Sequence, residues 1–123
     1  MAWAGANTPG DARFAVVSDT GWWVDGASEW FPALAGRASV ATPQGYEWVD
    51  GEFARRRAMH DKLGGCGDEA ASCLDEVMGE TAWTHVYVPS GCCQALKDSL
   101  RGSPEFTVQF DGSGALIAAR RDR

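Results

Sequence analysis

The chain has 123 residues and a mass of 13.2 kDa, which is the usual size of a single domain. Apolar residues make up 45% of the chain and charged residues 23%, a composition that excludes a disordered protein. The formal net charge of −6 argues against a protein that binds nucleic acid through its phosphate backbone. No apolar run reaches the length of about 18 residues that a membrane-spanning helix needs.

The first forty residues predict a linker and two strands. Residues 1–11 are mostly small or turn-forming, and we expect them to be a linker. A short apolar run with β-branched residues predicts a buried strand over Arg13–Ser18. A second, shorter strand is expected over Ala38–Ala41, where Pro43 follows.

A helix is expected between these strands, over Asp25–Leu34. Asp25 is suited to be its N-cap, and Gly36 is suited to follow its last turn. Pro32 either interrupts this helix or starts a second one. The apolar residues at helical spacing, which we expect to face the core, are Ala27, Trp30, Phe31 and Leu34.

The second half of the chain predicts three helices and three strands. Two helices separated by a glycine-rich loop come first, and then an alternating strand that leads through Ser90 into a helix with Cys93, Leu96 and Leu100 on its core face. A hairpin with a turn at residues 111–114 closes the chain. The expected elements are helices Glu52–Leu63 and Asp68–Met78, strand Thr81–Pro89, the helix after Ser90, and strands 106–110 and Ala115–Arg120.

The predicted order of elements is β-α-β-α-α-β-α-β-β. Strands that alternate with helices indicate an α/β fold with right-handed crossovers. We therefore predict a layered, Rossmann-like α/β domain over residues 12–123, with a mostly parallel mixed sheet that ends in a β-hairpin.

The four cysteines suit disulfides better than a metal site. Zinc sites usually use cysteine pairs about two to four residues apart, whereas Cys66 and Cys73 are widely spaced and Cys92 and Cys93 are adjacent. We therefore expect no metal and no cofactor. A continuous helix would hold Cys66 and Cys73 about 10 Å apart, which is too far for a disulfide, but the glycines around Cys66 make that bridge feasible. Crossed links to Cys92 and Cys93, and four reduced cysteines, stay open as alternatives.

The sequence lacks the familiar catalytic motifs, so we predict no catalytic residue. His85 lies on an aromatic strand face and is expected to be packed, while His60 lies on an arginine-rich helix and is expected to be solvated. The alternative is a small thiol-dependent enzyme that uses Cys92 or Cys93, because a cysteine at a helix N-terminus has a lowered pKa.

Tryptophans gather in the first half of the chain. In open α/β sheets, ligands bind beyond the carboxyl ends of the strands, where Ser18–Trp23 and Pro89–Cys92 are expected to lie. Trp22 and Trp23 cannot both point inward, so at least one of them is expected at the surface; Trp30 and Trp48 are expected in the core. Tryptophans beside polar side chains suit a sugar or a membrane interface. The predicted ligand or interface face comprises Trp22, Trp23, Asp25, Glu29, Arg37, Gln44, Glu47 and Trp48.

Several ordered pieces of the chain resemble the soluble C-terminal domain of polytopic bacterial membrane proteins. A strand, Trp22-Trp23 and the segment EWFPALAGRASVATPQGYEW (Glu29–Trp48) come first, followed by THVYVP and LRGSPEFTVQFDGSGA. These proteins resemble type-C glycosyltransferases of the dolichyl-phosphate-mannose-protein mannosyltransferase type. The most specific piece is PALAGR (residues 32–37), in which Ala35 replaces the threonine of that family.

This resemblance implies a location and a parent protein, and it implies no catalytic residue in this segment. It implies a domain on the extracytoplasmic face of the bacterial cell membrane, where disulfides are stable. Its partners would be the membrane domain of the same polypeptide and a sugar or lipid-linked sugar, with no nucleic acid. Arg37 is the charged residue of the shared motif, and we expect it to have a structural role at a helix end.

Overall fold

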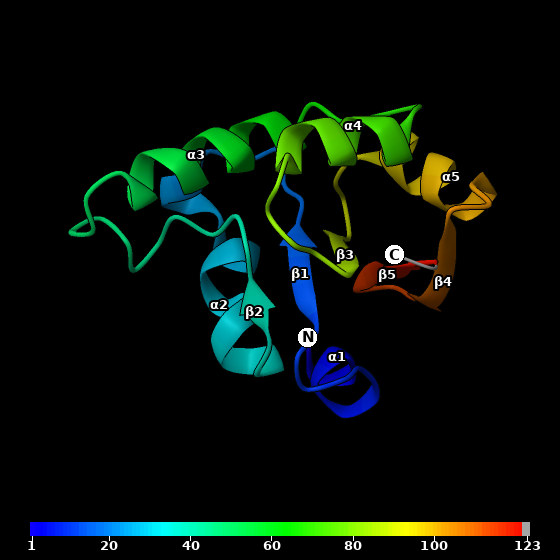
Figure 1. Ribbon diagram of the computed structural model, residues 1–123. Coiled ribbons are helices and arrows are strands. Elements are labelled where there is room, and N and C mark those ends of the chain that lie inside the picture. Colours follow the sequence, from blue (N-terminus) through cyan, green and yellow to red (C-terminus); the bar gives the residue numbers. More distant parts are fainter. Residues whose placement is uncertain (122–123) are drawn as a thin grey trace.

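Two layers of helices enclose a five-stranded mixed sheet in the computed structural model, which describes residues 1–121 (Figure 1). Helices α3, α4 and α5 cover one face of the sheet, and α1 and α2 cover the other. The elements are α1 (Ala2–Asn7), β1 (Arg13–Val16), the 3₁₀ helix η1 (Trp22–Val24), α2 (Gly26–Ala35), β2 (Ala38–Ser39), α3 (Glu52–Leu63), α4 (Ala70–Met78), β3 (His85–Pro89), α5 (Gln94–Gly102), β4 (Phe106–Asp111) and β5 (Ala115–Arg120).

The sheet has the order β2-β1-β3-β5-β4. β1 pairs in parallel with β2 and with β3, while β5 runs antiparallel to both β3 and β4. Four strands therefore point the same way and only β5 is reversed. The predicted α/β class, the mostly parallel mixed sheet and the closing hairpin are confirmed.

The two edges of the sheet differ from its centre. β2, at one edge, contains only two residues. β4, at the other edge, alternates buried and exposed side chains, and its register shifts between Val108 and Phe110. The central strands β1, β3 and β5 are almost wholly buried, as expected for strands covered on both faces.

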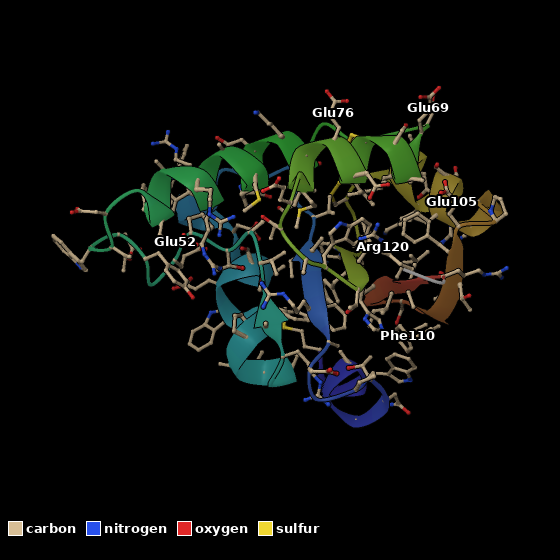
Figure 2. The ribbon with its side chains drawn as sticks, in the orientation of Figure 1. Glu52, Glu69, Glu76, Glu105, Phe110 and Arg120 are labelled. Atoms are coloured by element: carbon tan, nitrogen blue, oxygen red, sulfur yellow. A yellow bond between two sulfur atoms is a disulfide. The ribbon has the colours of Figure 1, made fainter. Side chains whose placement is uncertain are left out.

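Alternate side chains of the central strands supply two separate cores. In β3, Val86 and Val88 point toward α3, α4 and α5, whereas Tyr87 points toward α1 and α2. The larger core contains the helix residues Leu63, Leu74, Met78, Leu96 and Leu100, all buried. Glu69 and Glu76 lie on the opposite, exposed side of α4, where Figure 2 shows them pointing away from the sheet.

Helix α2 is apolar on two neighbouring stripes and buries only one of them. The prediction placed Trp30 and Leu34 in the core, but they are 57% and 60% exposed. Phe31 is buried, as predicted, and the other buried residues of the helix are Ser28 and Ala35. Because successive residues are rotated by about 100° around a helix, the two stripes cannot both face the sheet. The small side chains of Ser28 and Ala35 let the backbone approach closely around Phe31.

Pro32 lies inside α2 without ending it. Proline has no N–H group, so the carbonyl oxygen of Ser28 loses its usual helical donor. The hydroxyl of Thr42 donates a hydrogen bond to that oxygen at 3.2 Å, and it also accepts one from the Ser28 hydroxyl at 3.0 Å. The buried Ser39 hydroxyl bonds Thr42 as well. A side chain from the following loop thus completes the helix.

The N-terminal segment differs from the expected linker. Residues 2–7 form α1, and Ala4 is fully buried in the smaller core. α1 approaches α2 so closely that a Cβ atom on Gly5 would lie 2.5 Å from the carbonyl oxygen of Ala35. The small residues that suggested a linker serve this close contact.

Arg37 fastens α1 to the end of α2. One Nη atom of Arg37 donates to the carbonyl oxygens of Gly5 and Thr8, both at 2.8 Å, and its Nε donates to the Thr8 hydroxyl at 3.2 Å. The structural role expected for Arg37 agrees with these contacts, which leave it half-buried. It therefore belongs to the scaffold of the domain.

We expect Arg37→Ala to loosen α1 without unfolding the sheet. Loss of the three hydrogen bonds should lower the free energy of unfolding by about 1–3 kcal/mol and should speed amide hydrogen exchange in residues 2–8. Arg57→Ala, which removes an exposed guanidinium from α3, is the matched control and should change neither. Unchanged exchange in residues 2–8 of the Arg37 variant would refute this role.

Candidate functional site

The carboxyl ends of β1 and β3 form the edge at which ligands bind in open α/β sheets. Because the two strands are parallel neighbours, the segments that follow them meet there. They line a hollow of about 270 Å³. Its walls include residues 18–20 and 89–92, so the sequence-based placement of these segments at one edge is confirmed. The N-terminus of α2 supplies the third side of the hollow.

A buried histidine–carboxylate pair, His60 and Asp25, lies at this edge of the sheet. Nε2 of His60 lies 2.7 Å from Oδ2 of Asp25, and the two side chains are 1% and 3% exposed. Oδ1 of Asp25 accepts a hydrogen bond from the backbone N–H of Ser28 at 3.0 Å, so the predicted N-cap is confirmed. The expectation that His60 is solvated is wrong, because α3 ends against the segment after β1: a Cβ atom on Gly64 would collide with the Ser18 carbonyl.

The pair is charged. Burial raises the pKa of Asp25, but hydrogen bonds from His60, the Ser28 amide and the Ser18 hydroxyl outweigh burial and leave this pKa below its ordinary value of 3.8. Burial lowers the pKa of His60, but its hydrogen bonds with Asp25 and Asp61 outweigh burial and leave its pKa above 6.5. An imidazolium and a carboxylate therefore join α3 to α2.

This pair has the wrong connectivity for nucleophilic catalysis. In a Ser-His-Asp triad the histidine must contact the serine hydroxyl, whereas the Ser18 hydroxyl here bonds Asp25. Both ring nitrogens of His60 are engaged, Nε2 by Asp25 and Nδ1 by Asp61 at 3.3 Å. His60 thus has no nitrogen available as a general base, and the pair is a structural element of the site.

The six most exposed large apolar side chains all lie between residues 23 and 49. We call them the tryptophan surface: Trp23, Val24, Trp30, Leu34, Trp48 and Val49. Trp48 is 94% exposed, so the expectation of a core position for Trp30 and Trp48 is wrong for both. Trp48 lies within a turn at residues 46–49 and belongs to no strand or helix that would direct it inward.

Trp22 and Trp23 differ in exposure, and one of them lies at the surface as the sequence predicted. Trp23 is 68% exposed, whereas Trp22 is half-buried with its ring 5.0 Å from that of Phe53. The two indoles meet edge to face at 6.3 Å. The side-chain amide of Gln44 donates to the carbonyl oxygen of Trp22 at 2.5 Å, which fastens the 43–50 loop to η1.

The eight residues of the predicted face therefore separate into different roles. Trp23, Glu29, Glu47 and Trp48 are exposed, Asp25 is buried against His60, and Arg37 holds α1. Trp22 and Gln44 connect η1 to the loop that follows β2. Of the eight, Glu29 and Gln44 line a common cleft.

That cleft lies between α2, β2 and α3 and has a volume of about 440 Å³, within the range of small-molecule sites. Arg56 stacks on the Tyr46 ring with its guanidinium carbon 3.8 Å from the ring centroid. Oε1 of Gln44 is buried and has no hydrogen-bond partner among the described residues. Sequence reasoning missed Tyr46 and Arg56, because an arginine and an aromatic residue ten positions apart carry no periodic signal. The lining residues are Arg13, Glu29, Pro32, Ala33, Ala38, Ser39, Val40, Thr42, Gln44, Tyr46 and Arg56.

All four cysteines form disulfides. Cys66 and Cys73 are bonded with Cα atoms 5.7 Å apart, because the chain turns between α3 and α4 instead of continuing as one helix. This is the bridge that the glycines made feasible. Cys92 is bonded to its neighbour Cys93, so the crossed and reduced alternatives do not hold in this structure.

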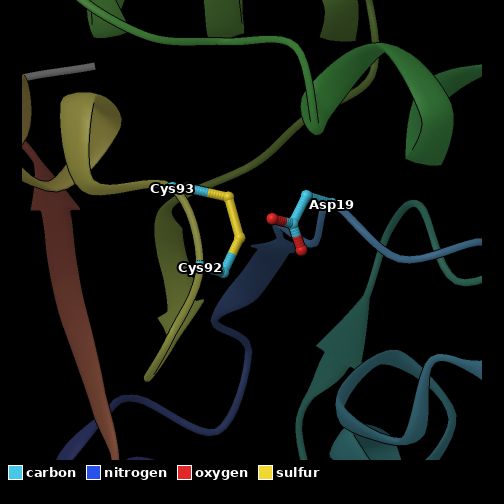
Figure 3. Close-up of side chains that lie close together, drawn as sticks. All are labelled: Asp19, Cys92 and Cys93. Atoms are coloured by element: carbon cyan, nitrogen blue, oxygen red, sulfur yellow. A yellow bond between two sulfur atoms is a disulfide. The ribbon is translucent and has the colours of Figure 1, made fainter.

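Asp19 lies beside the adjacent pair (Figure 3). One oxygen of its carboxylate and the two sulfur atoms of Cys92 and Cys93 lie within 4.8 Å of one another. Sulfur that is bonded in a disulfide is not a thiolate ligand, so this group holds no metal while the disulfide is formed.

No protein-family profile matches the chain, and no curated protein or solved structure is significantly similar to it. None of the helices described within residues 1–121 is long and apolar enough to cross a membrane. The features that bear on function are therefore the tryptophan surface, the cleft and the sequence resemblance.

The buried pair makes stability depend on pH. Because the pKa of folded His60 lies above 6.5, its contribution to stability is complete below pH 6.5 and is lost as the pH rises through the folded pKa. Because the pKa of folded Asp25 lies below 3.8, its contribution is present above pH 3.8 and is lost as the pH falls through the folded pKa. Urea unfolding should therefore show a lower free energy of unfolding once the pH rises through the folded pKa of His60.

His60→Gln should abolish that alkaline loss. His85→Gln is the control, because burial lowers the pKa of His85 and keeps this residue neutral in the same range. The His85 variant should retain the alkaline loss. An equal alkaline loss in the His60 variant would assign it to another group.

Proposed function

We propose that this chain is a non-catalytic extracytoplasmic accessory domain of a glycosyltransferase-like bacterial membrane protein. In this proposal it docks onto the membrane domain of the same polypeptide and helps to position a sugar acceptor. The tryptophan surface is the observation that carries the proposal, and the resemblance of residues 14–48 to such proteins names the parent.

The tryptophan surface is unusual in its concentration. Single exposed apolar side chains are normal on soluble proteins, whereas an interaction site uses several large apolar side chains. In the part of the chain that the structure describes, the exposed large apolar side chains all lie within residues 23–49. Three of them are tryptophans, the residue type most enriched at binding hot spots and at membrane–water interfaces.

The charges around this surface favour a protein partner over a bare bilayer. Surfaces that bind anionic lipid combine apolar residues with Lys and Arg. Here the exposed acidic side chains of Glu29, Glu47 and Asp50 lie in the same segment, and the net charge is −6. Extracytoplasmic loops of the membrane domain, held at the membrane surface, are therefore the partner we propose.

The bonded state of the four cysteines supports an extracytoplasmic location. Disulfides persist outside the reducing cytoplasm, and this chain has two. The alternative of a thiol-dependent enzyme requires a free sulfur at Cys92 or Cys93, and both are engaged in a disulfide.

The decisive test uses the membrane-bound parent polypeptide. We expect the full open reading frame to encode several hydrophobic helices, and a photo-crosslinking residue at Trp48 to form crosslinks to the membrane domain. The matched control is Gln109 of β4, also exposed but outside the tryptophan surface, which should give none. Peptide mass spectrometry identifies the crosslinks. A reading frame without membrane helices, or equal crosslinking from both positions, would contradict the proposal.

The cleft between α2 and β2 is the place at which we propose that the sugar binds. Gln44 lines this cleft, and its buried Oε1 has no hydrogen-bond partner among the described residues. Glu29 offers a second acceptor, while the stacked Tyr46 and Arg56 form a flat wall. The guanidinium group of Arg56 is paired with the Glu52 carboxylate at 2.7 Å, and that of Arg13 donates to the carbonyl oxygen of Ala82 at 2.9 Å. A neutral, hydroxyl-rich ligand fits this balance better than an anion.

We expect methyl pyranosides at millimolar concentration to shift the amide NMR signals of residues 29–33 and 44–46. Glu29→Gln should weaken this binding about tenfold, since a hydrogen bond to a charged group contributes about 1.5 kcal/mol. Glu47→Gln is the control, because Glu47 is exposed but does not line the cleft. Absence of saturable shifts with every pyranoside, or stronger binding of inorganic phosphate, would overturn the sugar assignment.

A further inference from the structure

The two disulfides of this chain differ in what they contribute to stability. Cys66–Cys73 joins residues separated by 7 positions and packs against the larger core. By the chain-entropy relation, the stabilisation that a disulfide provides grows with the length of the loop that it closes. Cys92–Cys93 closes a shorter loop, with a sequence separation of 1. The stabilisation that comes from constraining the unfolded chain is therefore larger for Cys66–Cys73 than for Cys92–Cys93.

The backbone around Cys92–Cys93 is held in a sparsely populated conformation. Cys93 has a φ angle of +63°, and it is the only residue other than glycine with a positive φ among residues 1–121. Gly91, two positions earlier, has a φ of +79°. A left-handed conformation is unfavourable for a residue with a Cβ atom. Reduction would open the ring and free Cys93 to leave this conformation, which favours the reduced state.

The two cysteines of this disulfide differ in exposure. Cys93 is the N-cap residue of the nine-residue helix α5, and its side chain makes no capping hydrogen bond. Cys92 lines the hollow beyond β1 and β3 but is only 6% exposed, whereas Cys93 is half-buried. Because disulfide exchange requires access to the sulfur that is attacked, the sulfur of Cys93 is the one that an incoming thiolate reaches more readily, and Cys92 is the leaving group.

Asp19 controls which thiolate can approach. Its exposed carboxylate lies within 4.8 Å of both sulfur atoms (Figure 3). A negative charge at this distance repels an anionic thiolate, and the repulsion grows with the charge of the attacking molecule. A reductant without additional negative charge is favoured over one that carries several carboxylates.

We propose that Cys92–Cys93 is a thiol–disulfide exchange site that accepts two electrons from a dithiol protein. One thiolate of the dithiol attacks Sγ of Cys93, the bond between the two sulfurs breaks, and Cys92 leaves as a thiolate. The second thiolate of the dithiol then attacks the dithiol sulfur that is bonded to Cys93 and releases Cys93 as a thiolate. The dithiol becomes a disulfide, Cys92 and Cys93 become a dithiol, and solvent protons balance the charges. Cys66–Cys73 takes no part.

The first test follows which cysteines open in the native chain. The chain is incubated with graded dithiothreitol, alkylated, and mapped by peptide mass spectrometry. We expect alkylation of Cys92 and Cys93 at reductant concentrations at which Cys66 and Cys73 stay bonded, with the circular dichroism spectrum unchanged. Opening of Cys66–Cys73 first, simultaneous opening of both disulfides, or resistance of Cys92–Cys93 until the chain unfolds would each overturn the proposal.

The second test isolates Asp19. Asp19→Asn should speed reduction by glutathione about threefold and should change the rate with cysteamine much less, because cysteamine carries a compensating positive charge. Asp11→Asn removes an exposed carboxylate that precedes β1 and does not line the hollow; it is the matched control and should leave both rates unchanged. Equal acceleration with the two thiols would refute the electrostatic role of Asp19. Both tests use the chain alone, so their outcome is independent of the docking proposal.

Discussion

The ion pair between Asp25 and His60 is the contact on which the arrangement of this edge depends. α2 and α3 lie on opposite faces of the sheet, and the contact between Asp25 and His60 joins them beyond the end of β1. Asp25 caps α2 and bonds His60, so one carboxylate fixes both helices and the segment between β1 and α2. Since an unpaired buried charge costs several kcal/mol, these contacts form together. The positions of Trp22 and Trp23 follow from them.

α2 carries more apolar surface than the fold uses. Ser28, Phe31 and Ala35 form the side of α2 that is buried in the domain. The Thr42 hydroxyl donates a hydrogen bond to the carbonyl oxygen that Pro32 leaves without a helical donor. Nothing in the core requires Trp30 or Leu34 to be apolar. Sequence features that folding does not need are those for which an external partner is the natural explanation, and this reasoning connects the helix to the proposed docking role.

Local patterns predicted the elements well because strand alternation, helix caps and glycine breaks act over a few residues. They placed the segments after β1 and β3 at one edge and allowed the Cys66–Cys73 bridge. They could not choose between the two apolar stripes of α2, since that choice depends on how closely the sheet and α1 approach. Local patterns also did not predict that His60 is buried, because its partner Asp25 lies 35 positions away. Nor did they predict α1, because its small residues are needed only for the close approach to Ala35.

The edges of the sheet have a consequence for behaviour at high local concentration. An exposed edge strand offers unpaired backbone groups to which another chain can add. Here one edge is a strand of only two residues, and the other is interrupted by an irregular register. Backbone-mediated association is therefore disfavoured at both ends. Contacts of this domain with its surroundings must be made by side chains, and side chains can select one partner where a backbone edge would accept many.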